Sequence, residues 1–300
     1  MDYYLTVEIG GTQLRYGVVN EAFEAVEFEK EPNTGFSEAK DKGEYLAGLL
    51  NPWIKKYGKA NFHCISLCLA SLLNKERTVN YNSPNIKGLD NISLTGILEK
   101  RLGMRAFMER DVNTVLLYEI MKGNIDPAGI VIGIFLGTGL GNAMCIDGKI
   151  YIGASGSSCE LGHIPTAGLD EACGCGKKSC IELLASGKRL AELAKNKYRC
   201  PVDKIFTAHG KEPDVRSVVH MAAIATATEI TILDPNCVIL GGGVMETAGF
   251  PFDLFEQIVR ENLRIPNPRQ SVKFVRASGD PAAGIVGAAL NARGKLLTGY

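Results

Sequence analysis

The sequence has no excess of charge of either sign, because its 300 residues include 33 Lys and Arg and 33 Asp and Glu. Such a balance provides no long-range field that would attract nucleic acid or an anionic membrane. No run of about 18 apolar residues is present, so we expect no membrane-spanning helix. The N-terminal text MDYYLTVEIGG lacks the basic start and separate apolar stretch of a secretory signal and is typical of a first strand. We therefore expect neither nucleic-acid nor membrane partners.

The sequence also lacks the even, regularly spaced cysteines of a disulfide framework, since it has nine cysteines. Cys64, Cys68, Cys145 and Cys237 lie in apolar, strand-like text, which is typical of buried thiols in a reducing compartment. We therefore expect a cytoplasmic protein, and we interpret the cysteine cluster in residues 173–180 as a metal site before a disulfide.

The pattern of the first half of the chain returns in the second half. Residues 3–20 and residues 130–152 each read as strand, glycine turn and strand, and each is followed by alternating strands and helices. This alternation predicts two similar α/β domains that arose from a weak internal duplication.

Two of the predicted helices have features that the structure can test. EYLAGLLNPWIKKYG has an apolar helical face, and Pro52 is expected to kink or divide this helix. The last helix should begin at Asp280 and Pro281, which suit a helix start. Its face carries small residues that permit close packing, and we expect it to pack across the domain boundary. These small residues are Ala282, Ala283, Gly284, Gly287 and Ala288.

Three glycine-rich turns follow strand-like segments. They are 10–12 (GGT), 137–139 (GTG) and 240–244 (LGGGV). Backbone N–H groups in such turns can bind phosphate, and threonine adds a hydroxyl donor. One such turn alone is more typical of a plain hairpin, but two with the same pattern favour phosphate binding. No Gly-Lys-Ser/Thr follows, and a strand rather than a helix comes after the first two turns, so they are neither Walker A nor Rossmann motifs.

Asp111 ends a predicted strand and precedes a predicted helix. Ligands in α/β folds bind outside the carboxyl ends of strands. A carboxylate there can accept the proton of a hydroxyl that attacks phosphorus. The alternative is a helix N-cap, a common role for Asp before a helix.

The segment ELGHIPTAGLDEACGCGKKSCIE, residues 160–182, concentrates metal-ligand side chains. Cys173, Cys175 and Cys180 need a fourth ligand, and His163 lies close enough along the chain to complete a Cys3His zinc set. Four protein ligands leave no open position, so the zinc would be structural. Free thiols are the alternative, and Cys159 is a competing ligand. A redox role is weaker because Cys-x-x-Cys is missing.

Taken together, these residues resemble the ROK family (repressors, open reading frames and kinases) of actin-like sugar kinases, over nearly the whole chain. The resemblance implies two actin-like (ribonuclease H-like) α/β domains with an interdomain cleft and a structural zinc loop. The domains would comprise residues 1–112 with 281–300, and residues 113–280 with the zinc loop. The signature reads Glu160-Leu-Gly-His163, then Cys173-Gly-Cys175-Gly-Lys-Lys-Ser179-Cys180-Ile-Glu182.

The resemblance implies ATP-dependent phosphorylation of a hexose at its 6-hydroxyl, with Mg²⁺, a structural Zn²⁺ and a homodimeric assembly. Asp111 would be the general base. Sugar contacts are implied for Asn85, Arg110, Asp111, Glu160, His163 and Glu182, ATP contacts for Gly10, Gly11, Thr12, Gly137, Thr138, Gly139, Gly242 and Gly243, and zinc ligation for His163, Cys173, Cys175 and Cys180.

Three residues depart from the family pattern. Glu8 replaces the usual Asp that helps organise Mg²⁺, and its extra methylene is expected to move the carboxylate. Ser179 replaces a Gly before the last zinc cysteine. Arg110 replaces the Asn of glucose-type members, and an Arg offers only donors.

The text around Arg110 is most similar to members of the family that phosphorylate D-allose. Glucose, N-acetylmannosamine and fructose stay open as alternative acceptors. A silent sugar sensor and a repressor also stay open; repressors of the family carry a DNA-binding segment before the first glycine loop, which here starts at Gly10.

Overall fold

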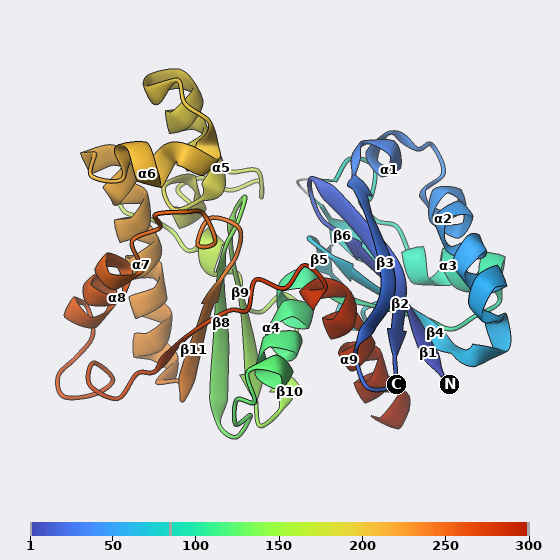
Figure 1. The fold of residues 1–300 in the computed structure, drawn as a ribbon. Coiled ribbons are helices and arrows are strands. Elements are labelled where there is room, and N and C mark those ends of the chain that lie inside the picture. The colour runs from blue at the N-terminus through green and yellow to red at the C-terminus, as the bar shows by residue number, and fades with distance from the viewer. Residues whose placement is uncertain (1, 84–85, 299–300) are drawn as a thin grey trace. The chain divides into compact units, whose positions relative to one another are not determined.

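The computed structural model describes residues 2–83 and 86–298, which form two compact units (Figure 1). Unit 1 comprises Met1–Ile125, Ile152–Ser158 and Asp280–Tyr300, and unit 2 comprises Asp126–Tyr151 and Cys159–Gly279. The sequence placed a boundary at residue 112 and kept 113–280 continuous, whereas in the structure unit 1 continues to Ile125 and includes 152–158. No helix in the described residues is both long and apolar enough to cross a bilayer.

Unit 1 is built on a five-stranded sheet with the strand order β3-β2-β1-β4-β7. The first three strands form an antiparallel meander, and β4 and β7 extend the sheet in parallel with β1. The strands are β1 (Tyr3–Ile9), β2 (Gln13–Asn20), β3 (Ala25–Pro32), β4 (Phe62–Leu69) and β7 (Ala106–Arg110), beside a small hairpin of β5 (Leu72–Leu73) and β6 (Asn80–Asn82).

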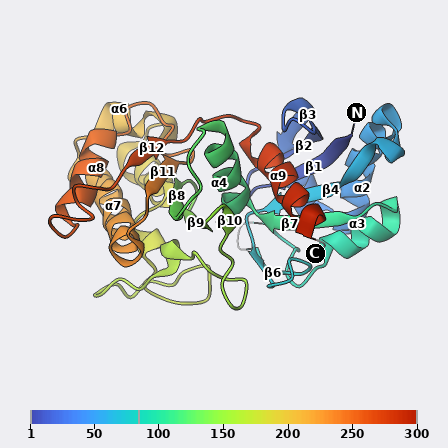
Figure 2. The same cartoon turned by 90° about the horizontal axis from the view of Figure 1, so that it is seen from below.

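Helices cover both faces of this sheet. One core contains side chains of β1, β4, α2 and α3, and a second contains Tyr4, Tyr118 and the small residues of α9. Figure 2 shows α9 beside α4 and along the sheet. Residues Leu46, Leu50 and Trp53 of α2 are buried on one face, as their spacing predicts. The helices are α1 (Thr34–Glu38), α2 (Lys42–Tyr57), α3 (Leu94–Leu102), α4 (Asp111–Lys122) and α9 (Ala283–Thr298).

The structure differs from the predictions for two helices, α2 and α9. Helix α2 is continuous through Pro52, so of the two predicted effects, a kink or a division, the division does not occur, because the buried face on both sides of the proline holds one helix. Helix α9 packs closely through its small residues, as predicted: a side chain at Gly287 would collide with the backbone of Thr114 in α4. That contact lies inside unit 1, however, and not across a domain boundary as predicted.

Unit 2 repeats the sheet of unit 1, with the order β10-β9-β8-β11-β12. Its first three strands are again antiparallel, and β11 and β12 are again parallel to the central strand β8. The identical order and direction confirm the predicted repeat of one strand pattern and the two-part α/β fold. The strands are β8 (Ile130–Leu136), β9 (Leu140–Ile146), β10 (Lys149–Ile150), β11 (Cys237–Gly241) and β12 (Phe274–Arg276).

Helix α7 forms the centre of the unit 2 core, with ten buried residues along its length. Amphipathic α8 packs against it. The chain between β10 and α5 runs as a long loop with two short 3-10 turns, η2 (Leu161–His163) and η3 (Ile181–Leu183), seen in lime in Figure 2. The helices are α5 (Gly187–Leu193), α6 (Ile205–His209), α7 (Pro213–Leu233) and α8 (Phe252–Glu261).

Candidate functional site

The first glycine loop is the turn of the β1–β2 hairpin in unit 1. The N–H of Gly10 donates to the carbonyl of Gln13 at 2.9 Å, which closes the turn. Gly11 and Thr12 are exposed at its tip. The carbonyl of Thr12 accepts the N–H of Asn33 at 3.0 Å, so the end of β3 holds the tip in place. The loop is therefore an anchored turn whose exposed tip can offer backbone donors and the Thr12 hydroxyl to an anion.

The second glycine loop, 137–139, connects β8 and β9 in unit 2. Its carbonyl groups are held by the start of α5, because Gly137 accepts the N–H of Gly187 at 2.8 Å and Thr138 accepts that of Lys188 at 3.1 Å. Thr138 remains exposed. The loop is thus a second anchored turn, built in unit 2 at the position that the first loop has in unit 1.

The third glycine loop follows β11 and contacts the second. Gly242 has a φ of +94°, and a side chain there would meet the Leu136 carbonyl oxygen at 2.6 Å. The N–H of Val244 donates to the same carbonyl at 2.9 Å. Only glycine permits both the positive φ and the close approach of the Leu136 carbonyl at position 242. Two of the three predicted ATP loops are therefore brought together within unit 2.

Asp111 is the first residue of α4, directly after β7. Its Oδ1 accepts the N–H of Val112 at 2.8 Å, and Arg110 rather than Asp111 is the N-cap residue. Burial raises the pKa of Asp111 above its ordinary value, although the Val112 N–H and the Arg110 charge oppose this rise. A carboxylate whose pKa is raised is a stronger proton acceptor, as a general base requires.

Glu8 lies on β1 and forms an ion pair with Arg15 at 2.7 Å. Burial raises its pKa against the opposing effect of Arg15, and the charge of Asp111 raises it further. Its buried Oε2 has no hydrogen-bond partner among the residues that the structure describes. A side chain at Gly284 would meet this oxygen at 2.5 Å, so the glycine in α9 makes room for the extra methylene of Glu8.

Glu182 joins the predicted sugar-binding segment to the second glycine loop. Its Oε2 accepts the N–H of Leu140 at 2.9 Å. A side chain at Gly139 would collide with the Glu182 carboxylate, and one at Gly162 would lie 3.2 Å from its Oε2. The sequence did not predict this contact, because Leu140 and Glu182 are 42 residues apart.

The four predicted metal ligands form one cluster in unit 2. The ligand atoms of His163, Cys173, Cys175 and Cys180 all lie within 4.8 Å of one another. His163 Nδ1 is 3.7 Å from Cys173 Sγ, and the Sγ atoms of Cys175 and Cys180 are 3.6 Å apart. Around one tetrahedral zinc with Zn–S of about 2.3 Å, the sulfur atoms are expected roughly 3.8 Å apart. The donor set and its spacing therefore fit a structural Zn²⁺.

The other nitrogen of His163 faces a predicted sugar contact. His163 Nε2 lies 3.6 Å from Glu160 Oε2. A histidine that binds metal through Nδ1 directs Nε2–H toward such a carboxylate, and each fixes the orientation of the other. Ser179 has a φ of +66°, which explains why the family pattern has Gly at this position.

Comparison with known proteins agrees with this geometry. The family model described as "ROK family" matches residues 4–295. The chain belongs to the ROK family. An N-acetyl-D-glucosamine kinase of Vibrio parahaemolyticus is 30% identical over 319 residues, which cover 95% of this chain and 98% of the relative.

Solved structures of the ROK family share the fold. A hexokinase from Thermus thermophilus is 26% identical with a TM-score of 0.78, covering 99% of each chain. A glucokinase from Streptomyces griseus, in complex with glucose and AMPPNP, is 24% identical with a TM-score of 0.81, covering 97% of this chain and 99% of that one. The ROK fold therefore extends over nearly the whole chain.

Asn85 and Arg110 are the remaining predicted sugar contacts. Asn85 lies outside the described residues. Arg110 is 8% exposed, and its Nη1 donates to the carbonyl of Ser158 at 2.7 Å. The sequence predicted that this guanidinium contacts sugar, and it did not predict the backbone partner.

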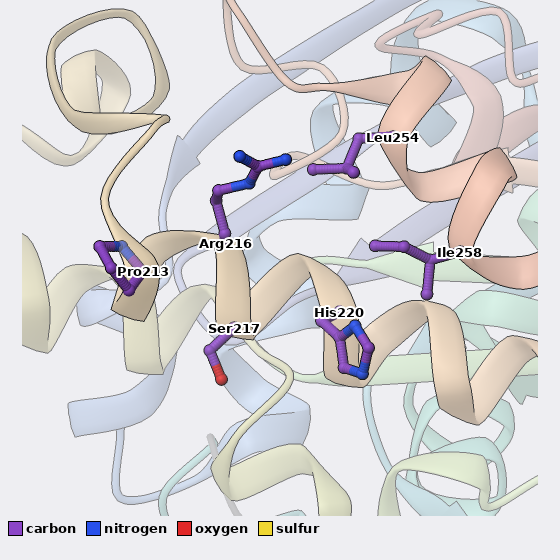
Figure 3. Close-up of a pocket in the computed structure, with 6 residues that line it drawn as sticks. All are labelled: Pro213, Arg216, Ser217, His220, Leu254 and Ile258. Carbon is purple, nitrogen blue, oxygen red and sulfur yellow. The ribbon is translucent and has the colours of Figure 1, made fainter.

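A surface depression of unit 2 lies between α7 and α8, and none of the predicted site residues lines it (Figure 3). Arg216, Ser217 and His220 of α7 and Leu254 and Ile258 of α8 line it. The three α7 residues are exposed. This depression therefore belongs to none of the predicted ROK binding sites.

A buried pair, Asn142 and Glu229, holds the start of the predicted sugar-binding segment. Glu229 of α7 is 7% exposed and accepts a hydrogen bond from Asn142 Nδ2 at 2.8 Å. Asn142 Oδ1 in turn accepts the N–H of Leu161 at 2.9 Å. Burial raises the pKa of Glu229 from 4.5 to about 7, although Asn142 opposes the rise. A family motif could not reveal Glu229, since its partner Asn142 lies 87 residues away in sequence.

Because the pKa of Glu229 is raised, we expect the free energy of unfolding to depend on pH, and Glu229→Gln should remove this dependence. Because the folded pKa is raised, the contribution of Glu229 is fully present below pH 4.5 and is lost as the pH rises through 7. The free energy of unfolding of the wild type, relative to that of the Gln variant, should fall by about 2–3 kcal/mol between roughly pH 5 and pH 8. Urea unfolding across this range measures it. Exposed Glu192→Gln is the control, and parallel wild-type and E229Q curves would contradict the prediction.

Proposed function

We propose that this protein is an ATP-dependent sugar kinase that transfers the γ-phosphoryl group to the 6-hydroxyl of a hexose or an N-acetylhexosamine. The observation that carries the proposal is the end-to-end match to a curated sugar kinase, which covers 95% of this chain and 98% of the relative. The fold positions two glycine loops on equivalent hairpins and an Asp of raised pKa at a strand end, which are the parts that such a reaction needs.

In the proposed reaction Asp111 is the general base. Its carboxylate accepts the proton of the sugar 6-hydroxyl while that oxygen forms a bond to the γ-phosphorus. The bond from the γ-phosphorus to the bridging oxygen breaks, and ADP leaves with the electron pair. Burial suits Asp111 to this role because it raises the pKa and so strengthens the base.

The ATP phosphates are assigned to the glycine loops. Gly10, Gly11 and Thr12 would donate from unit 1, and 137–139 from unit 2, with 242–243 beside the adenosine. Mg²⁺ bound with ATP supplies charge neutralisation at the phosphates. The buried Oε2 of Glu8, which has no hydrogen-bond partner in the part of the chain that the structure describes, fits a role in holding that ion or its water.

The sugar hydroxyls are assigned to Glu160, His163 and Glu182, with Asn85, and Arg110 belongs to the same site through its hydrogen bond to the Ser158 carbonyl. His163 is also a zinc ligand in this proposal, and its Nε2 faces Glu160. The zinc would therefore hold the segment that carries Glu160, while Glu182 is held independently by the N–H of Leu140. Structural Zn²⁺ takes no part in the chemistry.

The identity of the acceptor rests on two opposing arguments. Arg110, in place of the Asn of glucose-type members, favours D-allose. The curated relative and the two solved structures named above act, by their names, on N-acetyl-D-glucosamine, on hexose or on glucose. The relatives favour the alternative to allose, so we propose an acceptor in the class of glucose and N-acetylhexosamines and retain D-allose as a competitor.

The values of kcat/KM with saturating ATP identify the acceptor. N-acetyl-D-glucosamine, D-glucose, D-allose, N-acetyl-D-mannosamine and D-fructose should be compared side by side. We expect N-acetyl-D-glucosamine or D-glucose to exceed D-allose by at least tenfold. The opposite order would restore allose, while turnover with none of the five would contradict the proposed function.

A further inference from the structure

Segment 152–158 lies in unit 1 although its neighbours in sequence, Tyr151 and Cys159, lie in unit 2. Two arginines hold its backbone. Arg77 Nη1 donates to the carbonyl of Gly156 at 2.8 Å, and Arg110 Nη1 donates to that of Ser158 at 2.7 Å. Two residues after Ser158 comes Glu160, the first proposed sugar contact of unit 2.

Glu109, a buried carboxylate, binds Arg77 through its guanidinium and Arg110 through its backbone N–H. Arg77 Nε lies 2.9 Å from Glu109 Oε1, and the side chains are each 3% exposed. The same oxygen accepts the N–H of Arg110 at 2.9 Å and the Asn113 amide at 2.9 Å. A buried ion pair persists when such additional hydrogen bonds satisfy its charges. We call Arg77, Glu109 and Arg110 the arginine clamp.

The backbone around the arginine clamp is shaped to bring segment 152–158 close. Arg77 has a φ of +56°, a backbone conformation that favours glycine. An arginine at this position is therefore strained, and its contacts must compensate for the strain. Gly156 has a φ of +86°, and a side chain there would meet the N of Lys75 at 2.7 Å. The turn that carries Arg77 therefore touches the segment's backbone directly.

We propose that the arginine clamp positions the segment leading into Glu160, so that Arg110 acts on the sugar indirectly, through the Ser158 carbonyl. Glu109 also holds the first turn of α4, which begins with Asp111. One buried carboxylate thus fixes both the proposed base and the start of the sugar-binding segment. Arg77 and Arg110 are positioning residues. Their effect on sugar binding rests on the proposed function, whereas their effect on the position of segment 152–158 does not.

Hydrogen exchange tests the arginine clamp without reference to activity. Arg77→Lys keeps the charge beside Glu109 but loses the fork that reaches Gly156, and Arg110→Asn is too short to reach Ser158. Amides in residues 153–160 should exchange about tenfold faster in each variant, the effect of losing one charge-assisted hydrogen bond. Arg101→Lys, which alters a surface ion-pair residue of α3, is the matched control and should change nothing. Unchanged exchange in both test variants would overturn the proposal.

Kinetics separate positioning from direct reading of the sugar. If Arg110 acts through Ser158, Arg110→Asn should lower kcat/KM for D-glucose, D-allose and N-acetyl-D-glucosamine by the same factor. Arg77→Lys should raise the KM for sugar and leave that for ATP unchanged. A change of tenfold or more in the ratio of glucose to allose in Arg110→Asn would overturn indirect action. Faster exchange in a protein that phosphorylates no sugar would uphold the clamp and contradict the proposed function.

Discussion

Asp111→Asn should lower kcat by about 10²–10⁴-fold, the usual contribution of a general base. The amide cannot accept the hydroxyl proton, but its oxygen can still accept the N–H of Val112, so the start of α4 should be kept. Steady-state kinetics with ATP and the best acceptor measure the loss.

The control for this variant is Asp126→Asn, in which an exposed Asp also accepts a nearby backbone N–H. Its activity should stay at the wild-type level, and the melting temperatures of both variants should stay within a few degrees of the wild type. Activity above a tenth of the wild type in Asp111→Asn would contradict the assignment of the base.

The dependence of kcat/KM on pH is a second test of Asp111 as the general base. The base must be deprotonated to act, and burial raises the pKa of Asp111. The value of kcat/KM should therefore fall on acidification with an apparent pKa above the ordinary Asp value of 3.8. This acid limb should be missing from the residual activity of Asp111→Asn.

Removal of zinc should weaken sugar binding about 10–100-fold, the usual effect of disturbing the groups around a metal ligand. Cys180→Ser removes one ligand from the cluster. Without bound zinc, the His163 ring is no longer fixed in its position beside Glu160. The KM for ATP should change much less. Glu182 should also stay in place, because the N–H of Leu140 holds it independently.

Metal analysis and kinetics together measure this effect. The wild type should contain one zinc per chain, Cys180→Ser should lose it, and Cys200→Ser, which lies outside the cluster, should keep both zinc and activity. Equal losses of sugar and ATP affinity would mean that the metal only holds the loop together. A wild type without zinc would contradict the metal assignment.

Local patterns in the sequence predicted the parts of this protein whose determinants are close together. The hairpins around the glycine turns follow from alternating apolar residues and glycine, and the repeat of this pattern correctly predicted two α/β units with the same sheet order. His163 and the three cysteines lie within 18 residues, so spacing alone brings them together. Asp111 was chosen as a candidate because the end of a strand marks a ligand-binding edge, and in the structure it does directly follow β7.

Contacts between distant segments could not be predicted in this way. Glu8 is accommodated by Gly284, and Arg110 reaches Ser158, in both cases across long stretches of chain. The limits of unit 1 depend on the packing of α4 against α9, which no local pattern encodes. The continuity of α2 through Pro52 likewise depends on its buried face and not on the local preference of proline.

The central claim is phosphoryl transfer from ATP to a sugar hydroxyl, and ³¹P NMR of the reaction tests it most directly. With Mg²⁺, ATP and N-acetyl-D-glucosamine or D-glucose, we predict a new phosphomonoester signal split by the two protons on C6, in an amount equal to the ADP formed. Release of inorganic phosphate alone, or intact ATP with every sugar tried, would contradict the account.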